Sequence, residues 1–140
     1  NQLKRLNNFI KIRNYNRKKI IEKLTKSYNW KNQFTFLNSS KYVKPSWFGL
    51  PILVDRKYIK IKNKFLKYLE KNKIENRPII SGNFLNHPAA KLYNLNKNRN
   101  IFTNAQEVQE LGFLIGLHTK RIDKKKLKLI HDTFFKIDTI

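Results

Sequence analysis

The hydrophobic and polar positions along the chain predict a long helix followed by short strands and further helices. Apolar residues recur at three- and four-residue steps through residues 1–28, without Gly or Pro, as they do in an amphipathic helix. The same spacing returns over residues 58–72 and in the closing segment, where Asp123 can cap the helix through its carboxylate. We therefore expect helices in all three segments.

Four segments of the chain are predicted to be strands. Residues 33–37 alternate, residues 47–54 are almost continuously apolar, and residues 112–117 have the pattern of a buried strand. A further strand is expected over residues 73–80. Because Pro51 has no backbone N–H, its strand should lie at a sheet edge there or carry a bulge.

Two shorter helices and a loop complete the pattern. Pro88 suits the first turn of a short helix. Asn104 and Glu107 have the spacing of a capping box at the start of another. Residues 94–100 are polar and should form a loop.

These elements predict an α+β fold, with a long N-terminal helix and then a small antiparallel or mixed sheet covered by helices. We divide the chain into the entering helix, residues 1–28, and one α+β domain, residues 29–140. With 140 residues, 40% of them hydrophobic, the chain can build one packed core. The absence of Cys excludes disulfides, a thiolate nucleophile and zinc–thiolate sites. No apolar run reaches the roughly 18 residues of a membrane span, so we expect no membrane partner.

The formal net charge of +22 raises the hypothesis of a basic nucleic-acid-binding module. Two features weaken it. The cations are 24 Lys and only 7 Arg, and bidentate recognition of phosphate or guanine favours Arg. Lys is also spread along the whole chain. We expect nucleic acid not to be a partner, and the basic module and a stand-alone interaction domain remain as alternatives.

No catalytic constellation is complete in the sequence. The number of lysines leaves a Lys nucleophile open, although none lies in a segment apolar enough to depress its pKa. His118 follows a buried strand and is expected to be structural, whereas His131 should be solvated on the closing helix. Trp47 and Phe48 are expected in the core.

The most informative segment runs from Arg77 to His87, where a strand ends and Gly82 lets the backbone turn. Binding groups are commonly placed on such loops of a rigid scaffold. Arg can hold a carboxylate or phosphate, and Asn can donate to and accept from hydroxyls. The alternative is a polar turn in which Asn side chains satisfy the local backbone. The candidate substrate-binding residues are Arg77, Ser81, Gly82, Asn83, Phe84 and His87.

Several motifs follow one another along the chain. They are Trp-Phe-Gly-Leu-Pro-Ile at 47–52, Arg-Pro and Gly-Asn-Phe within 77–84, Pro-Ala at 88–89, Asn-Ala at 104–105 and Gly-Phe-x-Ile-Gly at 112–116. With Arg13 and Asn16 on the opening helix, they resemble the C-terminal domain of the DegT/DnrJ/EryC1/StrS family. These are pyridoxal-phosphate-type nucleotide-sugar aminotransferases of the aspartate aminotransferase fold. The resemblance is greatest to the sugar 3-dehydratase branch of lipopolysaccharide biosynthesis.

The resemblance implies a small-domain fragment that lacks the large cofactor-binding domain, has no complete catalytic site and is inactive alone. The whole enzyme would transaminate or dehydrate a 4-keto-6-deoxy sugar nucleotide in the biosynthesis of surface polysaccharides and deoxysugars. Its cofactor would be pyridoxal phosphate or pyridoxamine phosphate, whose main binding residues are outside this chain. Its partners would be a nucleotide sugar, an amino donor such as glutamate and a second copy in a cytoplasmic homodimer. Arg77 and residues 81–84 would border the active site, and the role of His87 stays open.

Overall fold

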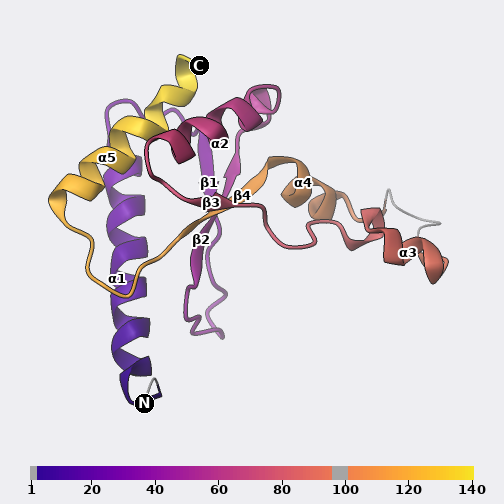
Figure 1. Ribbon diagram of the computed structural model, residues 1–140, viewed down its shortest axis with the longest axis horizontal. Coiled ribbons are helices and arrows are strands. Elements are labelled where there is room, and N and C mark those ends of the chain that lie inside the picture. The colour runs from indigo at the N-terminus through magenta and orange to yellow at the C-terminus, as the bar shows by residue number, and fades with distance from the viewer. Residues whose placement is uncertain (1–2, 96–100) are drawn as a thin grey trace.

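The computed structural model describes residues 3–95 and 101–140 and contains one four-stranded antiparallel sheet with helices packed on it (Figure 1). This arrangement confirms the predicted α+β class. The helices are α1 (Leu6–Thr25), α2 (Lys62–Lys71), α3 (Pro88–Leu92), α4 (Thr103–Leu111) and α5 (Lys124–Phe134), and the strands are β1 (Phe34–Phe36), β2 (Gly49–Val54), β3 (Asn76–Arg77) and β4 (Gly112–Gly116). Among the described residues, no helix is both long and apolar enough to cross a bilayer.

The strand order is β1-β2-β4-β3, and every neighbouring pair is antiparallel. Strand β1 ends at Phe36, opposite Ile52, so β2 has no neighbour on that side at Pro51. This is the free edge that the missing N–H of Pro51 requires. The predicted edge position is therefore confirmed.

The core lies between one face of the sheet and helices α1, α2 and α5. Alternate residues of β2 and β4 face these helices, and all of them are buried: Leu50, Ile52, Val54, Phe113 and Ile115. Phe65 of α2 is at the centre of an aromatic cluster, with its ring centroid 5.7 Å from that of Phe34 and 5.8 Å from that of Phe134. The helices predicted from the apolar spacing of the sequence are thus the ones that cover this face of the sheet.

Two local predictions are wrong. The expected strand over residues 73–80 is reduced to β3, because Pro78 removes the next backbone donor and Lys73 has a left-handed φ of 62°. Helix α4 exists, but its N-cap is Phe102 and no side chain caps it, so Asn104 forms no capping box. The closing helix is capped as predicted, with the Asp123 carboxylate accepting from the Lys126 N–H at 2.7 Å. Residues 96–100 of the predicted polar loop lie outside the described residues.

Helices α3 and α4 extend from the sheet on the side away from α1 (Figure 1). The segment that contains α3 and leads to α4, residues 80–102, has many exposed apolar side chains among the residues that the structure describes. They include Ile80, Phe84, Leu92, Tyr93, Leu95, Ile101 and Phe102, with exposed fractions from 49% to 88%. It therefore differs from the helix-covered sheet face, where the large apolar side chains are buried.

Candidate functional site

The turn at residues 81–84 depends on a backbone that few residues adopt. Ser81 has a φ of 67° and Gly82 a φ of 40°, both in the left-handed region. Gly82 also lies directly on α4: a Cβ at this position would be 2.6 Å from the Cβ of Gln109. Glycine is therefore needed both for the turn and for its close approach to the helix.

Amide side chains hold the turn on α4. Asn83 is buried, its Nδ2 donates to Gln106 Oε1 at 3.0 Å, and its backbone N–H donates to Gln109 Oε1 at 3.1 Å. The side-chain oxygen of Asn83 accepts from the Leu85 N–H. Asn86 adds bonds from its Nδ2 to both glutamines, at 2.8 and 2.9 Å. Buried polar groups satisfied in this way fix a conformation, so Asn83 positions the turn rather than offering its amide to a ligand.

The sequence analysis missed Gln106 and Gln109. Their spacing of three residues places them on the same side of α4, and that spacing is the signal that could have found them. Without the tertiary structure, nothing indicated that this side of the helix faces the Asn-rich turn.

Phe84 and His87 are among the exposed residues of the turn. Their rings stack with centroids 5.8 Å apart and an interplanar angle of 4°, and Phe84 is 49% exposed. The Nδ1 of His87 accepts from the Ala89 N–H at 3.2 Å, which caps α3. In the neutral ring the proton is then on Nε2, which leaves a donor on the other edge of the imidazole.

Arg77 lies apart from the rest of the predicted site. Its Nε and one guanidinium nitrogen donate to Glu75 Oε1 at 3.0 and 2.6 Å, and both side chains are largely exposed. Arg77 also lines a groove together with Arg13 and Lys73, and no residue of the 81–87 segment lines that groove. The structure thus brings Ser81, Gly82, Asn83, Phe84 and His87 together on α4 and leaves Arg77 elsewhere.

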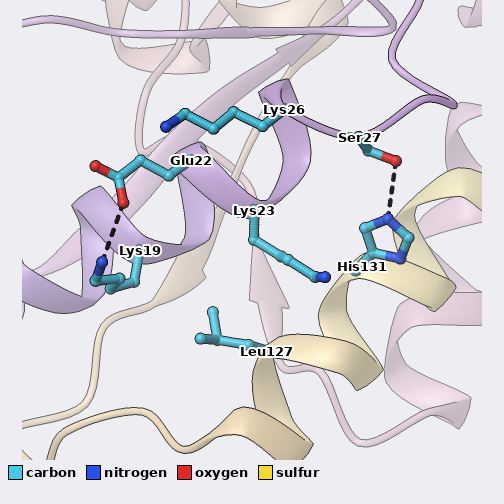
Figure 2. Close-up of a pocket in the computed structure, with 7 residues that line it drawn as sticks. All are labelled: Lys19, Glu22, Lys23, Lys26, Ser27, Leu127 and His131. Atoms are coloured by element: carbon cyan, nitrogen blue, oxygen red, sulfur yellow. Dashed lines mark hydrogen bonds and ion pairs between the residues drawn. The ribbon is translucent and has the colours of Figure 1, made fainter.

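His131 is not solvated as predicted: its side chain projects from α5 and contacts Ser27, just after the end of α1. Figure 2 shows its Nε2 and the Ser27 Oγ, which are 2.9 Å apart, beside a cavity of about 330 Å³. The His131 Nδ1 is 2.8 Å from a carboxylate oxygen of Asp132. Ser27 Oγ also accepts from the Asn29 N–H, so the contacts join the end of α1 to α5. We assign this group to helix packing rather than to catalysis.

Two other sequence expectations have clear outcomes. His118 is structural, since its Nδ1 accepts from the Lys120 N–H at 2.9 Å. Phe48 is 65% exposed, so its expected core position is wrong: β2 begins only at Gly49, and Phe48 lies before the segment that the helices cover. Trp47 is half-buried beneath the guanidinium of Arg17, whose carbon is 4.4 Å from the ring centroid.

Lys62 is buried, although the sequence placed no lysine in a strongly apolar segment. Burial lowers the pKa of its ammonium, which donates to the backbone oxygen of Glu110 at 2.7 Å. The bond ties the start of α2 to the end of α4. Within residues 3–95 and 101–140, no group of three His, Asp or Glu side chains could hold a metal ion.

No known protein-family profile matches the chain. A curated relative does match: the GDP-4-keto-6-deoxy-D-mannose 3-dehydratase of Escherichia coli O55:H7 is 28% identical over 119 residues. The aligned part covers 84% of this chain and 29% of that enzyme.

Solved structures share the fold. An E. coli GDP-4-keto-6-deoxy-D-mannose 3-dehydratase with bound hydrated PLP superimposes with a TM-score of 0.76 and 23% identity, over 94% of this chain and 32% of that one. A variant of GDP-4-keto-6-deoxymannose 3-dehydratase with bound GDP-perosamine gives 0.75 and 23%, over 94% and 32%. A sugar aminotransferase from Streptococcus pneumoniae in its PLP form gives 0.72 and 17%, over 99% and 33%. The chain is therefore homologous to one part of a GDP-4-keto-6-deoxy-D-mannose 3-dehydratase and spans about a third of that enzyme's length.

Proposed function

We propose that this chain is the C-terminal part of an enzyme of the DegT/DnrJ/EryC1/StrS family, in the branch of the sugar 3-dehydratases. The whole enzyme would act on a 4-keto-6-deoxy sugar nucleotide in the biosynthesis of surface polysaccharides. The observation that carries the proposal is the 28% identity to the E. coli dehydratase, together with a fold that matches the same enzyme at a TM-score of 0.76. The same assignment would place the protein in the cytoplasm as a homodimer.

The described residues do not fit pyridoxal phosphate by themselves. A site for this cofactor needs a lysine or histidine at its reactive carbon and a cup of donors for its phosphate. The buried Lys62 is bound to a backbone oxygen at a helix end and lines neither of the two cavities described above. The rest of the enzyme would therefore hold pyridoxal or pyridoxamine phosphate, which would act as the electron sink. Glutamate would serve as the amino donor.

This chain would contribute the 81–87 turn to substrate binding. Ser81, Phe84 and His87 are exposed, and the buried Asn83 holds them in place through α4. A hydroxyl, an aromatic face and an imidazole N–H are suitable contacts for a sugar and its hydroxyls. We expect Arg77 to act separately, from β3, on a negatively charged group.

The exposed apolar side chains of residues 80–102 indicate that another protein surface packs over this end of the molecule. Soluble monomers seldom expose so many large apolar residues in one region. In our proposal the rest of the enzyme and the second subunit cover them, which would also exclude water from the 81–87 turn.

A chimera tests the proposal. The part of the E. coli O55:H7 dehydratase that aligns with this chain is replaced by residues 1–140, and the same enzyme with that part deleted serves as control. We expect the chimera to convert GDP-4-keto-6-deoxy-D-mannose in the presence of pyridoxal phosphate and glutamate, and the deletion to be inactive. A folded chimera that binds the cofactor but converts no sugar nucleotide contradicts the proposal.

A further inference from the structure

The amide network that holds the 81–87 turn continues along α4 beyond Gln106. The Gln106 Nε2 donates to Glu110 Oε1 at 2.9 Å, one helical turn further along the same side of α4. The other oxygen of that carboxylate accepts from a guanidinium nitrogen of Arg56 at 3.4 Å. The turn is therefore connected through α4 to Arg56, two residues after the end of β2.

The hydrogen bonds of this network can run in one direction only. The Asn83 Oδ1 already accepts from the Leu85 N–H, so the Asn83 Nδ2 must donate and Gln106 must present its oxygen to it. The Nδ2 of Asn86 donates to the same Gln106 oxygen at 2.8 Å. If the Gln106 amide were reversed, its NH2 group would face two other NH2 groups, and the buried one of Asn83 would lose its acceptor.

Glu110 is the residue that selects this orientation of Gln106. An ionised carboxylate only accepts hydrogen bonds, so it binds the Gln106 Nε2 and disfavours the Gln106 oxygen in the same place. The hydrogen bond from Gln106, followed by the bond and the charge of Arg56, lowers the pKa of the Glu110 carboxyl. Glu110 is thus a charged acceptor at neutral pH.

We propose that Glu110 is a positioning residue for the 81–87 turn: it orients the Gln106 amide and through it holds Asn83 and Asn86. Glu110 itself touches no substrate. Without its carboxylate the Gln106 amide is free to rotate, and the turn that carries Phe84 loosens from α4. The importance of the turn for substrate rests on the proposed function, whereas its attachment to α4 does not.

Amide hydrogen exchange of the full 140-residue chain tests the attachment. Glu110→Ala should speed exchange of the backbone amides of residues 83–87 about threefold to tenfold, because the turn opens locally when its supporting hydrogen bonds weaken. Exchange in β2 and β4 should stay unchanged, since neither strand depends on this network.

Two further variants serve as controls. Glu107→Ala is matched to Glu110→Ala, because Glu107 is on the same helix and pairs with the same Arg56, at 3.8 Å, but has no hydrogen bond to Gln106 among the described residues. It should change the exchange of the turn less than about twofold. Glu110→Gln keeps an oxygen that can accept from Gln106, so it should restore protection to within about twofold of the parent.

A double variant tests whether Glu110 acts through Gln106. In the Gln106→Ala background, Glu110→Ala should have no further effect on the exchange of the turn, because the group that Glu110 orients is already gone.

The chimera with the E. coli dehydratase tests the consequence for substrate. Glu110→Ala should raise the KM for GDP-4-keto-6-deoxy-D-mannose about threefold or more with a smaller change in kcat, Glu110→Gln should recover most of the loss, and Glu107→Ala should match the parent. A chimera that is inactive with Glu110 in place counts against the proposed function. The exchange measurements on the chain alone then still decide whether Glu110 positions the turn.

Four results overturn the inference. The first is unchanged exchange of the turn in Glu110→Ala. The second is an equal effect of Glu107→Ala, which would show a general effect of charge or of Arg56. The third is an undiminished effect of Glu110→Ala in the Gln106→Ala background, and the fourth is an unchanged KM in an active chimera whose turn has loosened.

Discussion

The helix-covered face of the sheet and the α3–α4 end of the molecule are held together by different kinds of contact. On the sheet face, side chains such as Phe65, Phe113 and Phe134 are fully buried against one another. At the α3–α4 end, amide side chains hold the turn, and many large apolar side chains are exposed. The helix-covered sheet face is stabilised by its own buried apolar contacts. The α3–α4 end instead exposes apolar side chains around a turn held by hydrogen bonds.

This difference implies that the sheet face mainly determines stability and that the α3–α4 end mainly determines binding. Burial of apolar area is the main source of folding free energy, so the sheet face should carry most of it. A turn held by a few hydrogen bonds contributes less, since each is worth about 1 kcal/mol net. We therefore expect substitutions in the two regions to affect different measurements.

The largest expected effect is on the aromatic core. Phe65→Ala removes a ring that contacts Phe34, Phe113 and Phe134, and should lower the free energy of unfolding by about 3–5 kcal/mol. Urea denaturation of the isolated chain measures this. Phe84→Ala is the control, because the Phe84 ring is 49% exposed and should cost under about 1 kcal/mol. Equal losses would remove the contrast between the two regions.

Asn16→Ala should come next. It leaves two backbone oxygens and one N–H of the 118–122 loop without their partner, at a cost of about 2–3 kcal/mol. Asn14→Ala, an exposed position on the same helix, should change the unfolding free energy by less than about 0.5 kcal/mol. A neutral Asn16→Ala would show that the loop is not fixed by this side chain.

Gly82→Ala should act locally. The new Cβ would clash with Gln109, and the alanine would have to adopt a φ of 40°. The turn should therefore shift away from α4. We expect faster amide hydrogen exchange at residues 83–87 and unchanged exchange in β2 and β4. Unchanged protection of the turn amides would contradict the role assigned to Gly82.

The smallest expected effect is on the pH dependence of stability. Burial, and then the hydrogen bond and charge of Asp138, raise the pKa of the Tyr58 hydroxyl above its ordinary value of 10.0. Because the folded-state pKa is raised, the stabilising contribution is complete below pH 10 and is lost as the pH rises above it. The urea midpoint should fall more between about pH 9 and 11 in the parent than in Tyr58→Phe. Equal slopes would mean that Tyr58 titrates alike in both states.

The sequence predicts the sheet-face region better than the α3–α4 end, and the reason is physical. Apolar spacing records which side of each element faces the core, so α1, α2, β2 and β4 could be placed, and Pro51 even predicted a free edge. Where apolar burial does not decide, some short-range rules failed, although Asp123 caps α5 and Pro88 begins α3 as predicted. Asn104 does not cap α4, and β3 is much shorter than the strand expected over residues 73–80.

The candidate site was found only in part for the same reason. The turn could be located from Gly82 and its neighbouring amides, but its supports, Gln106 and Gln109, lie more than twenty residues further along the chain. Hydrogen bonds over that separation leave no local pattern. The grouping of Arg77 with Arg13 likewise depends on how α1 packs on the sheet.

The most direct measurement compares two variants in the chimera with the E. coli dehydratase: the KM and kcat for GDP-4-keto-6-deoxy-D-mannose in Asn83→Ala and in Asn16→Ala. If the α4-supported turn contacts the sugar nucleotide, Asn83→Ala raises KM or lowers kcat about tenfold or more, while Asn16→Ala lowers the thermal midpoint more than Asn83→Ala does and leaves KM alone. The reverse outcome, with normal kinetics in Asn83→Ala and a raised KM in Asn16→Ala, would contradict the account, because the turn would then not contact the substrate.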